Sequence, residues 1–417
     1  MSTASKNNVR RAAVSALRAW SKGHDYADTL IERHASRNNL STLDRKLLNS
    51  ILMAVIRNKT VLDYWIARLR KGRLDDEVRD ILRVGLAQLL LLGIPDHAAV
   101  NETVNCGKSS VRGLLNAVMR NAVKKRKRLF DDLEKEENLS LIYSTPEWLV
   151  KHWTETFGAE QTEYLLAWNN QPAETYFRLN PLKTEAHEEI LASETVSPLE
   201  EEPGYYRLEG KPNNQWLAKG AIYIQDPSTH YSVDLLDAQP GEMILDACAA
   251  PGGKASLIGV KMNNQGSLLC TDSNEKRLKR LNENLINQGI TIADVLAWDW
   301  TEEPPAKWHQ HFDAILLDVP CSNTGVFRRR VDARWRTKPE TLSELAVIQE
   351  KILQNALLAI KPGGRIIYST CSIEPQENQD LIKSFVAKHE HLAVTKEHLA
   401  TPWENQIDGS YAARIQC

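Results

Sequence analysis

Apolar residues in the first third of the chain recur at steps of three and four positions, a spacing that places them on one face of a helix. The spacing is clearest at Val9, Ala12, Ala13 and Leu17 and again across residues 47–56. Residues 82–92 are nearly all apolar, and the helix breakers Gly93 and Pro95 follow them. We therefore expect 82–92 to be the central buried helix of a bundle formed by residues 9–128.

The pattern changes after Trp168, which closes a further helical stretch that begins at Pro146. Short strand candidates, separated by Pro and Gly, follow at 175–179, 205–208 and 221–225. From residue 240 onward, strands are predicted at 243–247, 267–272, 294–299, 312–318 and 365–369, with helices at 278–287 and 342–360. This alternation is typical of a doubly wound, Rossmann-like α/β sheet.

A chain of 417 residues is long enough for two or three domains. We predict an all-α bundle in residues 1–135 and, in residues 136–236, linker helices with a small α/β subdomain. Residues 237–417 are predicted to form the doubly wound domain. The acidic stretch 131–137 is interpreted as a hinge after the bundle.

Hydropathy and cysteine spacing exclude several classes of protein. No stretch approaches the ~18 uncharged apolar residues of a membrane span, and the first residues lack the apolar core of a secretory signal. We therefore expect a cytoplasmic protein with no membrane partner. The six cysteines include no C-x-x-C pair, so reduced thiols are expected rather than a disulfide framework or a metal site.

Charge is unevenly distributed along the chain. Residues 1–128 hold 25 Lys and Arg against 11 Asp and Glu, a net of +14, although the whole chain carries only −2. A basic module indicates a polyanionic partner, because phosphate contacts supply most sequence-independent affinity for nucleic acids. The basic run 124–128 is the first candidate for such a surface. The alternatives are a solvated helix end and a basic but inert helical domain.

The strand predicted at 243–247 leads into Asp-Ala-Cys-Ala-Ala-Pro-Gly-Gly-Lys, residues 246–254, directly before a helix. In doubly wound folds the ligand lies outside the carboxyl ends of the strands, and glycines there let the backbone approach it. The dinucleotide fingerprint G-x-G-x-x-G is not present. A Walker loop is also excluded, because the chain has Cys248 and Ala255 where that motif needs Gly and Ser or Thr.

Four successive strands are predicted to end at or near an acid: Asp246, Asp272, Asp299 and Asp318. An acid after the second strand can accept hydrogen bonds from ribose hydroxyls, and Asp299 falls where a group would meet an adenine. One such residue alone would be an ordinary turn aspartate. Four in succession favour a pocket for a nucleoside-bearing cofactor.

Two cysteines follow the last of these strands: Cys321 comes after 312–318, and Cys371 comes after 365–369. If the two strands are neighbours, both thiols lie in the crevice that faces the cofactor. A thiolate that adds to carbon 6 of cytosine makes carbon 5 nucleophilic, and Asp318 is placed to relieve charge at N3 and N4. Either thiol taken alone could equally be a small buried side chain, and this reasoning does not rank the two.

These motifs resemble those of the Sun (Fmu) family of bacterial ribosomal small-subunit RNA cytosine-C5 methyltransferases, also called the RsmB/NOP family. The resemblance covers nearly the whole chain and includes residues 84–89, 95–104 and 115–120 of the helical part. It implies a multidomain protein. A NusB-like helical RNA-binding domain and a small linking subdomain precede a Rossmann-like domain that uses S-adenosyl-L-methionine.

By this resemblance the substrate is a cytosine of 16S ribosomal RNA, free or partly assembled, and we expect a monomer. Cys371 would be the nucleophile, and Cys321 would assist release of the methylated base. The cofactor would be held by Cys248, Ala249, Ala250, Pro251, Gly252, Gly253, Lys254, Asp272, Asp299 and Asp318. The alternatives are the same chemistry on DNA, transfer RNA or 23S ribosomal RNA, and a non-catalytic NusB-type RNA-binding or antitermination protein.

Two segments depart from the family pattern. The family has His-Pro-Asp after an Arg pair, where this chain has Arg330, Val331 and Asp332, and an aromatic pair near the end is replaced by Ser410 and Tyr411. The first departure concerns a loop expected to contact RNA. The second concerns the packing of the last strand, and neither involves a residue with a proposed chemical role.

Overall fold

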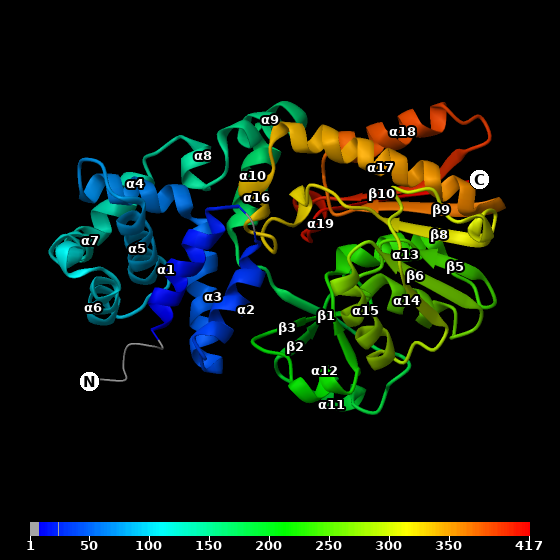
Figure 1. The fold of residues 1–417 in the computed structure, drawn as a ribbon, viewed down its shortest axis with the longest axis horizontal. Coiled ribbons are helices and arrows are strands. Elements are labelled where there is room, and N and C mark those ends of the chain that lie inside the picture. The colour runs from blue at the N-terminus through cyan, green and yellow to red at the C-terminus, as the bar shows by residue number, and fades with distance from the viewer. Residues whose placement is uncertain (1–7, 24) are drawn as a thin grey trace. The chain divides into compact units, whose positions relative to one another are not determined.

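The structure is a computed structural model that describes residues 8–23 and 25–417. The chain divides into two compact units (Figure 1). The first comprises the chain up to Gln171 together with Arg330–Arg336. The second comprises Pro172–Arg329 and Thr337–Cys417.

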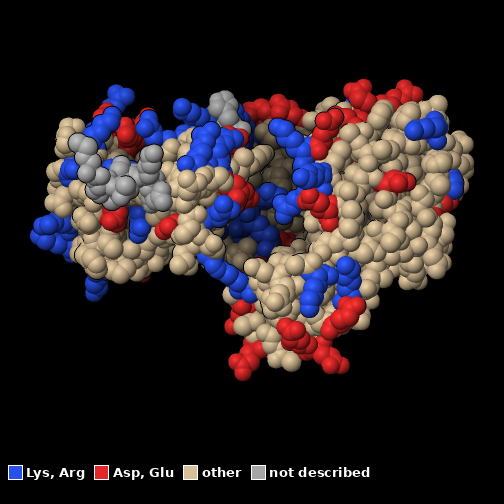
Figure 2. Space-filling view, turned by 60° about the horizontal axis from the view of Figure 1, so that its bottom comes forward, with Lys and Arg blue, Asp and Glu red and all other residues tan. Residues whose placement is uncertain are grey.

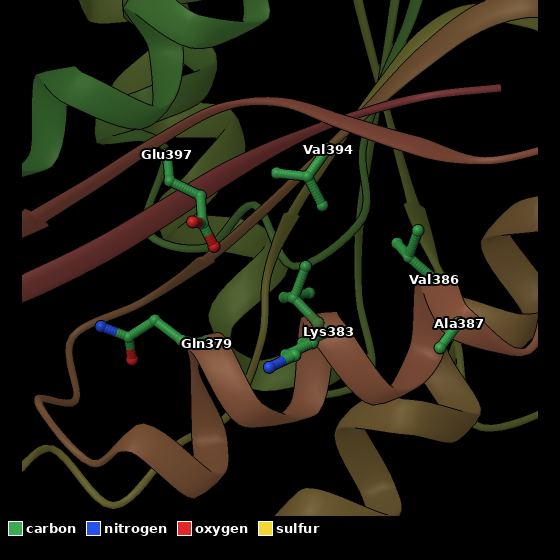
Figure 3. A pocket seen from close by; sticks show the side chains of 7 residues that line it. Gln379, Lys383, Val386, Ala387, Val394 and Glu397 are labelled. Carbon is green, nitrogen blue, oxygen red and sulfur yellow. The ribbon is translucent and has the colours of Figure 1, made fainter.

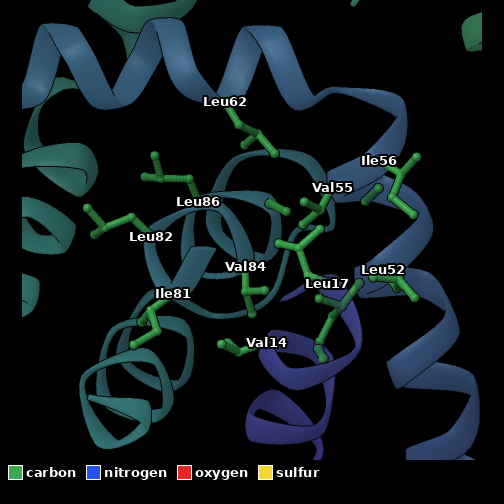
Figure 4. Close-up of a cluster of buried hydrophobic side chains, with 14 of the residues drawn as sticks. Val14, Leu17, Leu52, Val55, Ile56, Leu62, Ile81, Leu82, Val84 and Leu86 are labelled. Atoms are coloured by element: carbon green, nitrogen blue, oxygen red, sulfur yellow. The ribbon is translucent and has the colours of Figure 1, made fainter. Parts of the chain in front are cut away.

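The first unit is helical throughout its described residues. Its elements are α1 (Val9–Trp20), α2 (Ala27–Arg37), α3 (Thr42–Arg57), α4 (Lys59–Leu69), α5 (Asp76–Leu86), the π-helical turn η2 (Ala87–Leu91), α6 (Asp96–Cys106), α7 (Ser109–Leu133), α8 (Leu139–Ile142), α9 (Glu147–Phe157), α10 (Ala159–Asn170) and α16 (Ala333–Arg336). Leu17 of α1, Val55 of α3 and Leu82 of α5 meet in one hydrophobic core (Figure 4). The predicted bundle is confirmed, because the apolar stripes that predict its helices are buried together.

Residues 82–92 are mostly buried, as predicted, but they do not form one α-helix. The α-helical part ends at Leu86, and the wider turn η2 follows it. Ile94 N donates a 3.0 Å hydrogen bond to Gln88 O, which satisfies one of the last carbonyls of the helix. The next residue, Pro95, has no N–H to contribute.

Helix α7 continues through the basic run 124–128 and ends at Leu133, beyond residue 128, where the helical bundle was expected to end. The Leu129 carbonyl accepts a 3.1 Å hydrogen bond from Trp65 Nε1, and Phe130 packs edge-on against the Trp65 ring. These contacts extend the buried face of the helix beyond the run. The run therefore lies inside a helix rather than at its end, and the hinge predicted at 131–137 begins as the last turn of α7.

The segment Arg330–Arg336 interrupts the second unit in sequence but belongs to the first. Trp335 Nε1 donates to Ile56 O at 2.9 Å, and Asp332 Oδ2 accepts a 2.8 Å hydrogen bond from the first N–H of α2. Val331 is buried in the core of the bundle. The residues that depart from the family's His-Pro-Asp pattern therefore pack within the helical unit.

The described residues of the second unit form two sheets, of which the smaller is antiparallel in the order β2-β3-β1-β4. Its elements are β1 (Thr175–Leu179), α11 (His187–Leu191), β2 (Val196–Pro198), β3 (Tyr205–Leu208), α12 (Asn214–Ala218) and β4 (Ile222–Ile224). Phe177, Ile190 and Trp216 lie in its core. Acidic side chains gather on this subdomain, at the bottom of Figure 2. The sequence does not predict β2, because three residues ending in Pro198 give no alternating pattern.

In the described chain the larger sheet has seven strands in the order β10-β11-β9-β8-β5-β6-β7. Its strands are β5 (Met243–Asp246), β6 (Ser267–Asp272), β7 (Ala293–Ala297), β8 (Phe312–Asp318), β9 (Ile360–Thr370), β10 (Ala393–Ala400) and β11 (Ser410–Gln416). The accompanying helices are η3 (Pro227–Thr229), α13 (His230–Leu236), α14 (Gly253–Lys261), α15 (Glu275–Asn287), η4 (Ala306–Trp308), η5 (Thr324–Val326), α17 (Pro339–Ala359), η6 (Pro375–Glu377), α18 (Gln379–Ala387) and α19 (Pro402–Asn405).

Helices cover both faces of this sheet (Figure 1). Side chains of α17 and α18 belong to one hydrophobic core, and those of α13, α14 and α15 belong to another. The strands from β9 to β7 are parallel, whereas β11 is antiparallel to both β9 and β10. The predicted doubly wound, Rossmann-like domain is confirmed.

The predicted strands 267–272 and 312–318 coincide with β6 and β8. The strand predicted at 294–299 is wrong at its end, because β7 stops at Ala297 and Asp299 lies in the loop that follows. Strands β10 and β11 are not predicted from the sequence pattern. Strand β10 lies at the sheet edge with mostly exposed residues, so it lacks the buried apolar run that reveals the central strands.

His230, the first residue of α13, contacts two carboxylates. Its Nδ1 lies 2.5 Å from Asp234 Oδ2, and its Nε2 lies 2.8 Å from Glu202 Oε2. Burial by itself lowers the pKa of His230, but the hydrogen bonds and charges of the two carboxylates outweigh it and raise the pKa to about 9. The charged imidazolium therefore helps to hold the small subdomain, which carries Glu202, to α13.

The stability that His230 contributes is expected to disappear in alkaline solution. Its folded-state pKa of about 9 exceeds the ordinary value of 6.5, so the contribution is complete below pH 6.5 and is lost as the pH rises through 9. Urea unfolding at a series of pH values should show that the wild type is more stable than His230→Gln at low pH. The difference in their free energies of unfolding should shrink by about 1–3 kcal/mol between pH 6.5 and pH 9. His309→Gln is the control, since that ring contacts the Pro304 carbonyl. An advantage that stays constant with pH would contradict the prediction.

Candidate active site

A cavity of about 250 Å³ lies at the carboxyl end of β5, where the sequence predicts the cofactor site. Seven of the ten residues predicted to hold the cofactor line it: Cys248, Ala249, Ala250, Pro251, Gly253, Lys254 and Asp318. The loop after β5 and the end of β8 thus meet in one hollow, as expected for a doubly wound sheet.

Two glycines shape the turn from this loop into α14. Gly252 has a φ of +106°, in the left-handed region that favours glycine. A side chain at Gly253 would place its Cβ 3.0 Å from Nε2 of Gln225, which lines the same cavity. Glycine therefore keeps space open at the N-terminus of α14, where backbone N–H groups can meet a polar ligand.

Asp246 lines the cavity and is fully buried. Within the described chain, neither of its carboxylate oxygens has a partner in good hydrogen-bonding geometry. Burial, reinforced by the charge of Asp318, raises the pKa of Asp246 to about 8. A buried polar group of this kind calls for a partner. The cavity therefore fits S-adenosylmethionine, whose amino group and ribose hydroxyls are donors.

Lys254 and Asp318 form an ion pair at this cavity. Lys254 comes from the first turn of α14, and Asp318 is the last residue of β8. The lysine side chain is 13% exposed and the aspartate side chain 36% exposed. Asp318 is therefore held by the lysine and still open to a molecule that enters.

Asp272 and Asp299 do not line this cavity. Asp272, at the end of β6, is buried and pairs with Arg277 Nη1 at 3.2 Å. Asp299 is exposed in the loop after β7 and accepts hydrogen bonds from Thr301 N and Oγ1. Their contacts with ribose and adenine stay predictions.

The two predicted thiols come together at the same sheet edge. β8 and β9 are neighbours, with Asp318 paired to Ser369, and each strand leads into a loop with one cysteine. The Sγ atoms of Cys321 and Cys371 lie 3.2 Å apart, and both are free thiols. The S–H of Cys371 also donates to Asn323 Oδ1 at 3.3 Å. Cys321 comes three residues after Asp318, and Cys371 comes two residues after Ser369, the strand partner of Asp318; neither cysteine lines the cavity at β5.

The surroundings of Cys321 keep its sulfur protonated. Its hydrogen bond with Cys371, together with burial, raises the pKa of Cys321 well above the usual value, and the charge of Glu377 acts in the same direction. As a thiol, Cys321 can donate its proton toward the sulfur of Cys371.

One wall of the cavity was not predicted. Gln225, Asp226 and Thr229 line it from the end of β4 and the turn after it. From the sequence, residues 221–225 were expected only to form a short strand. The end of this strand could have been predicted from Gln225 and Asp226, because two polar residues directly before a proline favour a turn.

Another cavity, of about 460 Å³, lies between α18 and β10 (Figure 3). Its lining combines Val386 and Val394 with the charged residues Lys383 and Glu397. The hydroxyl of Tyr411 donates to Glu397. None of the residues predicted to bind or react lies in this cavity, so it does not compete with the site at β5.

Family models match three successive parts of the chain. The model described as 16S rRNA methyltransferase RsmB/F covers residues 233–416, and the NusB family model covers residues 7–124. The ferredoxin-like domain of RsmF/B-like methyltransferases matches residues 145–193. Ribosomal RNA small subunit methyltransferase B of Vibrio cholerae is 33% identical, over 97% of this chain and 96% of its own. The chain belongs to the RsmB/F methyltransferase family.

Solved structures show the same fold. PH0851 has a TM-score of 0.78 and 23% identity, covering 99% of this chain and 99% of its own. NSun6 of Pyrococcus horikoshii, solved with SFG, has a TM-score of 0.58 and 18% identity, covering 65% of this chain and 98% of its own. Both similarities concern the fold alone.

Membership of the RsmB/F family confirms the order of domains by type: a NusB helical domain, a ferredoxin-like linker and a Rossmann-like methyltransferase domain. It also confirms S-adenosylmethionine as the cofactor. Among the described residues, no helix is long and apolar enough to cross a membrane, and no group of three or more potential metal ligands occurs.

Proposed function

We propose that this RsmB/F protein methylates carbon 5 of a cytosine in 16S ribosomal RNA. The observation that carries the proposal is the pair of thiols 3.2 Å apart in the loops after β8 and β9, of which β8 ends in Asp318, a residue that lines the cavity. Methylation of carbon 5 requires a nucleophile that first adds to carbon 6, and a cysteine supplies it. The NusB match and the name of the Vibrio cholerae relative support small-subunit RNA as the substrate.

Different roles are assigned to the two thiols. Cys371 attacks carbon 6, and Asp318 relieves the charge that develops at N3 and N4 of the ring. The raised pKa of Cys321 makes it a poor nucleophile at neutral pH. The carbon 5 proton must then pass to water before the bond from Cys371 to the cytosine can break, and Cys321, whose sulfur lies 3.2 Å from that of Cys371, is assigned to assist this release.

When bound, S-adenosylmethionine supplies the methyl group that is transferred. We assign its binding to the loop 248–254 and to Asp272, Asp299 and Asp318, and we add Asp246. Asp246 offers buried carboxylate oxygens to donor groups of the ligand. Lys254 positions Asp318 through the ion pair between them.

Bisulfite sequencing of ribosomal RNA from cells with and without the gene tests the proposal. Because 5-methylcytosine resists deamination, one protected cytosine of 16S RNA should become convertible after deletion and protected again after complementation. If the deletion instead removed a protected cytosine from transfer RNA or 23S RNA, the proposed substrate would be wrong but the proposed chemistry would stand. If no RNA lost such a site and the purified protein transferred no methyl group, a non-catalytic RNA-binding role would take its place.

A basic cavity in the helical unit supports RNA as the partner. It measures about 600 Å³ and is lined by five cationic residues, Arg11, Arg18, Lys22, Arg33 and Arg37, against the acids Asp25 and Glu77. The run 124–128, in contrast, is spread around α7, because successive residues of a helix point in different directions. We therefore place the main phosphate contacts at the basic cavity and keep the run as a second candidate.

Neutralising this cavity is expected to weaken RNA binding and flatten its salt dependence. Replacing Lys22 and Arg37 with Gln removes two phosphate partners, so the slope of log K against log salt should fall by roughly 1.4–1.8. Fluorescence anisotropy with a 16S RNA fragment at a series of salt concentrations measures this slope. The matched control replaces Lys125 and Lys127 of α7 with Gln. If the slope fell only for the Lys125 and Lys127 variant, the main phosphate contacts would lie at the run 124–128.

A further inference from the structure

The carboxylate of Glu377 lies between the two thiol loops and is fully buried. Its Oε1 accepts hydrogen bonds from Ser322 N and from Gln349 Nε2, both at 3.0 Å. Its Oε2 accepts a 2.6 Å hydrogen bond from Ser372 Oγ and another from Ser322 Oγ. One side chain of η6 thus binds both loops and a residue of α17.

These contacts act on the residues that directly follow the thiols. Ser322 follows Cys321, and Ser372 follows Cys371. The two serine hydroxyls also lie 3.1 Å from each other, so the loops are joined directly as well as through the carboxylate. Because each serine is joined directly to its cysteine by a peptide bond, a shift of either serine moves the neighbouring Sγ.

Gln349 anchors the arrangement to α17. Its Nε2 donates to Pro320 O at 2.9 Å as well as to the Glu377 carboxylate. The loop that carries Cys321 is therefore held at Pro320, before the thiol, and at Ser322, after it. Removing the carboxylate would leave buried donors on both sides without their acceptor, a costly state that the loops can relieve only by moving.

We propose that Glu377 is a positioning residue that sets the separation of the Cys321 and Cys371 sulfurs for methyl transfer. The inference rests on the proposed function, because it concerns the same two thiols. Glu377 does not line the cofactor cavity; it holds the thiol loops through Ser322 and Ser372, and its charge also acts on Cys321. It follows that Glu377 governs the chemical step and leaves cofactor binding unchanged.

Two substitutions distinguish the effect of the length of the Glu377 side chain from the effect of its charge. Glu377→Gln keeps the length: its carbonyl can accept from Ser322 N and Gln349, and its amide can donate to the serine hydroxyls. Glu377→Asp keeps the charge but is one methylene shorter, so it cannot reach both loops. Leu353→Ala, at a buried position of α17 in the hydrophobic core, is the control for a general loss of stability.

Each purified full-length variant is assayed for kcat and KM with a 16S RNA fragment, for S-adenosylmethionine affinity, and for alkylation of Cys371 by iodoacetamide. Glu377→Asp should lower kcat by roughly 10²-fold, as a misplacement of about 1 Å does, with KM and cofactor affinity nearly unchanged. Its Cys371 alkylation rate should also differ from that of the wild type. Glu377→Gln should restore most of kcat, and Leu353→Ala should match the wild type below its melting temperature.

Equal kcat values for Glu377→Asp and Leu353→Ala would overturn the inference, as would a loss in Glu377→Gln as large as that in Glu377→Asp. If Glu377→Asp does not fold, Ser372→Ala removes one of the contacts and should give a smaller loss of the same kind. The alkylation assay needs no methyl transfer. If the wild type methylated no RNA, the proposed function would fail, whereas a changed alkylation rate would still support the positioning role.

Discussion

Replacing Cys371 with alanine is expected to abolish methyl transfer, lowering kcat by at least about 10⁴-fold. Without the attacking sulfur no adduct forms at carbon 6, and carbon 5 stays a poor nucleophile. The variant Cys321→Ala retains the attack but loses the group assigned to release. It should accumulate a covalent protein–RNA complex that survives denaturing electrophoresis.

Denaturing gels with a labelled 16S RNA fragment, together with a labelled-methyl assay, measure both effects. Cys417→Ala is the matched control, since it removes a partly buried free thiol of the same unit just after β11, and it should behave as the wild type. Trapping by Cys371→Ala rather than by Cys321→Ala would assign the attack to Cys321. Full activity of Cys371→Ala would exclude the covalent mechanism.

Asp408→Ala is expected to destabilise the second unit by about 3–5 kcal/mol, the usual cost of removing one member of a buried ion pair. Asp408 is fully buried, and its two oxygens pair with Nε of Arg328 and Nε of Arg329. Arg328 is only 2% exposed, so the substitution leaves its charge buried without this carboxylate. Arg329 also binds Asp226, which lines the cofactor cavity, at 2.6 Å. Cofactor affinity should therefore fall as well.

Urea unfolding of the full chain measures the first effect, and titration with S-adenosylmethionine measures the second. Glu350→Ala is the control, because it removes an ion pair with Lys388 whose side chains are 33% and 56% exposed. Exposed pairs contribute less than about 1 kcal/mol. Equal losses in the two variants would show that the buried pair contributes no more than the surface pair.

The parts of the fold that sequence reasoning located share a simple physical property. Central parallel strands are buried on both faces and alternate with helices, so β6 and β8 stand out as apolar runs. Strand β10 is mostly exposed, and β2 has three residues, so neither produces such a run. The bundle extends beyond its predicted end at residue 128, because the contact of Phe130 with Trp65, far away in the sequence, continues α7 beyond its charged run.

The position of the segment Arg330–Arg336 is even harder to predict from local sequence. The segment is rich in arginine and has no apolar stripe, so nothing in its local pattern assigns it to the helical unit. Its place is decided by distant partners, such as the carbonyl of Ile56 for Trp335 and the carbonyl of Asn169 for Arg334. No spacing rule connects these positions.

By itself the sequence determined the two kinds of domain, the cofactor loop 248–254 and the two candidate thiols, because each depends on local spacing or on a contiguous motif. Only the tertiary structure decided that β8 and β9 are neighbours, and hence that the sulfurs of Cys321 and Cys371 lie 3.2 Å apart. It also decided that Asp246 lines the cavity with no partner in good hydrogen-bonding geometry among the described residues, and that Glu377 joins both thiol loops. Such features arise from pairing between residues remote in the chain, which a linear pattern does not encode.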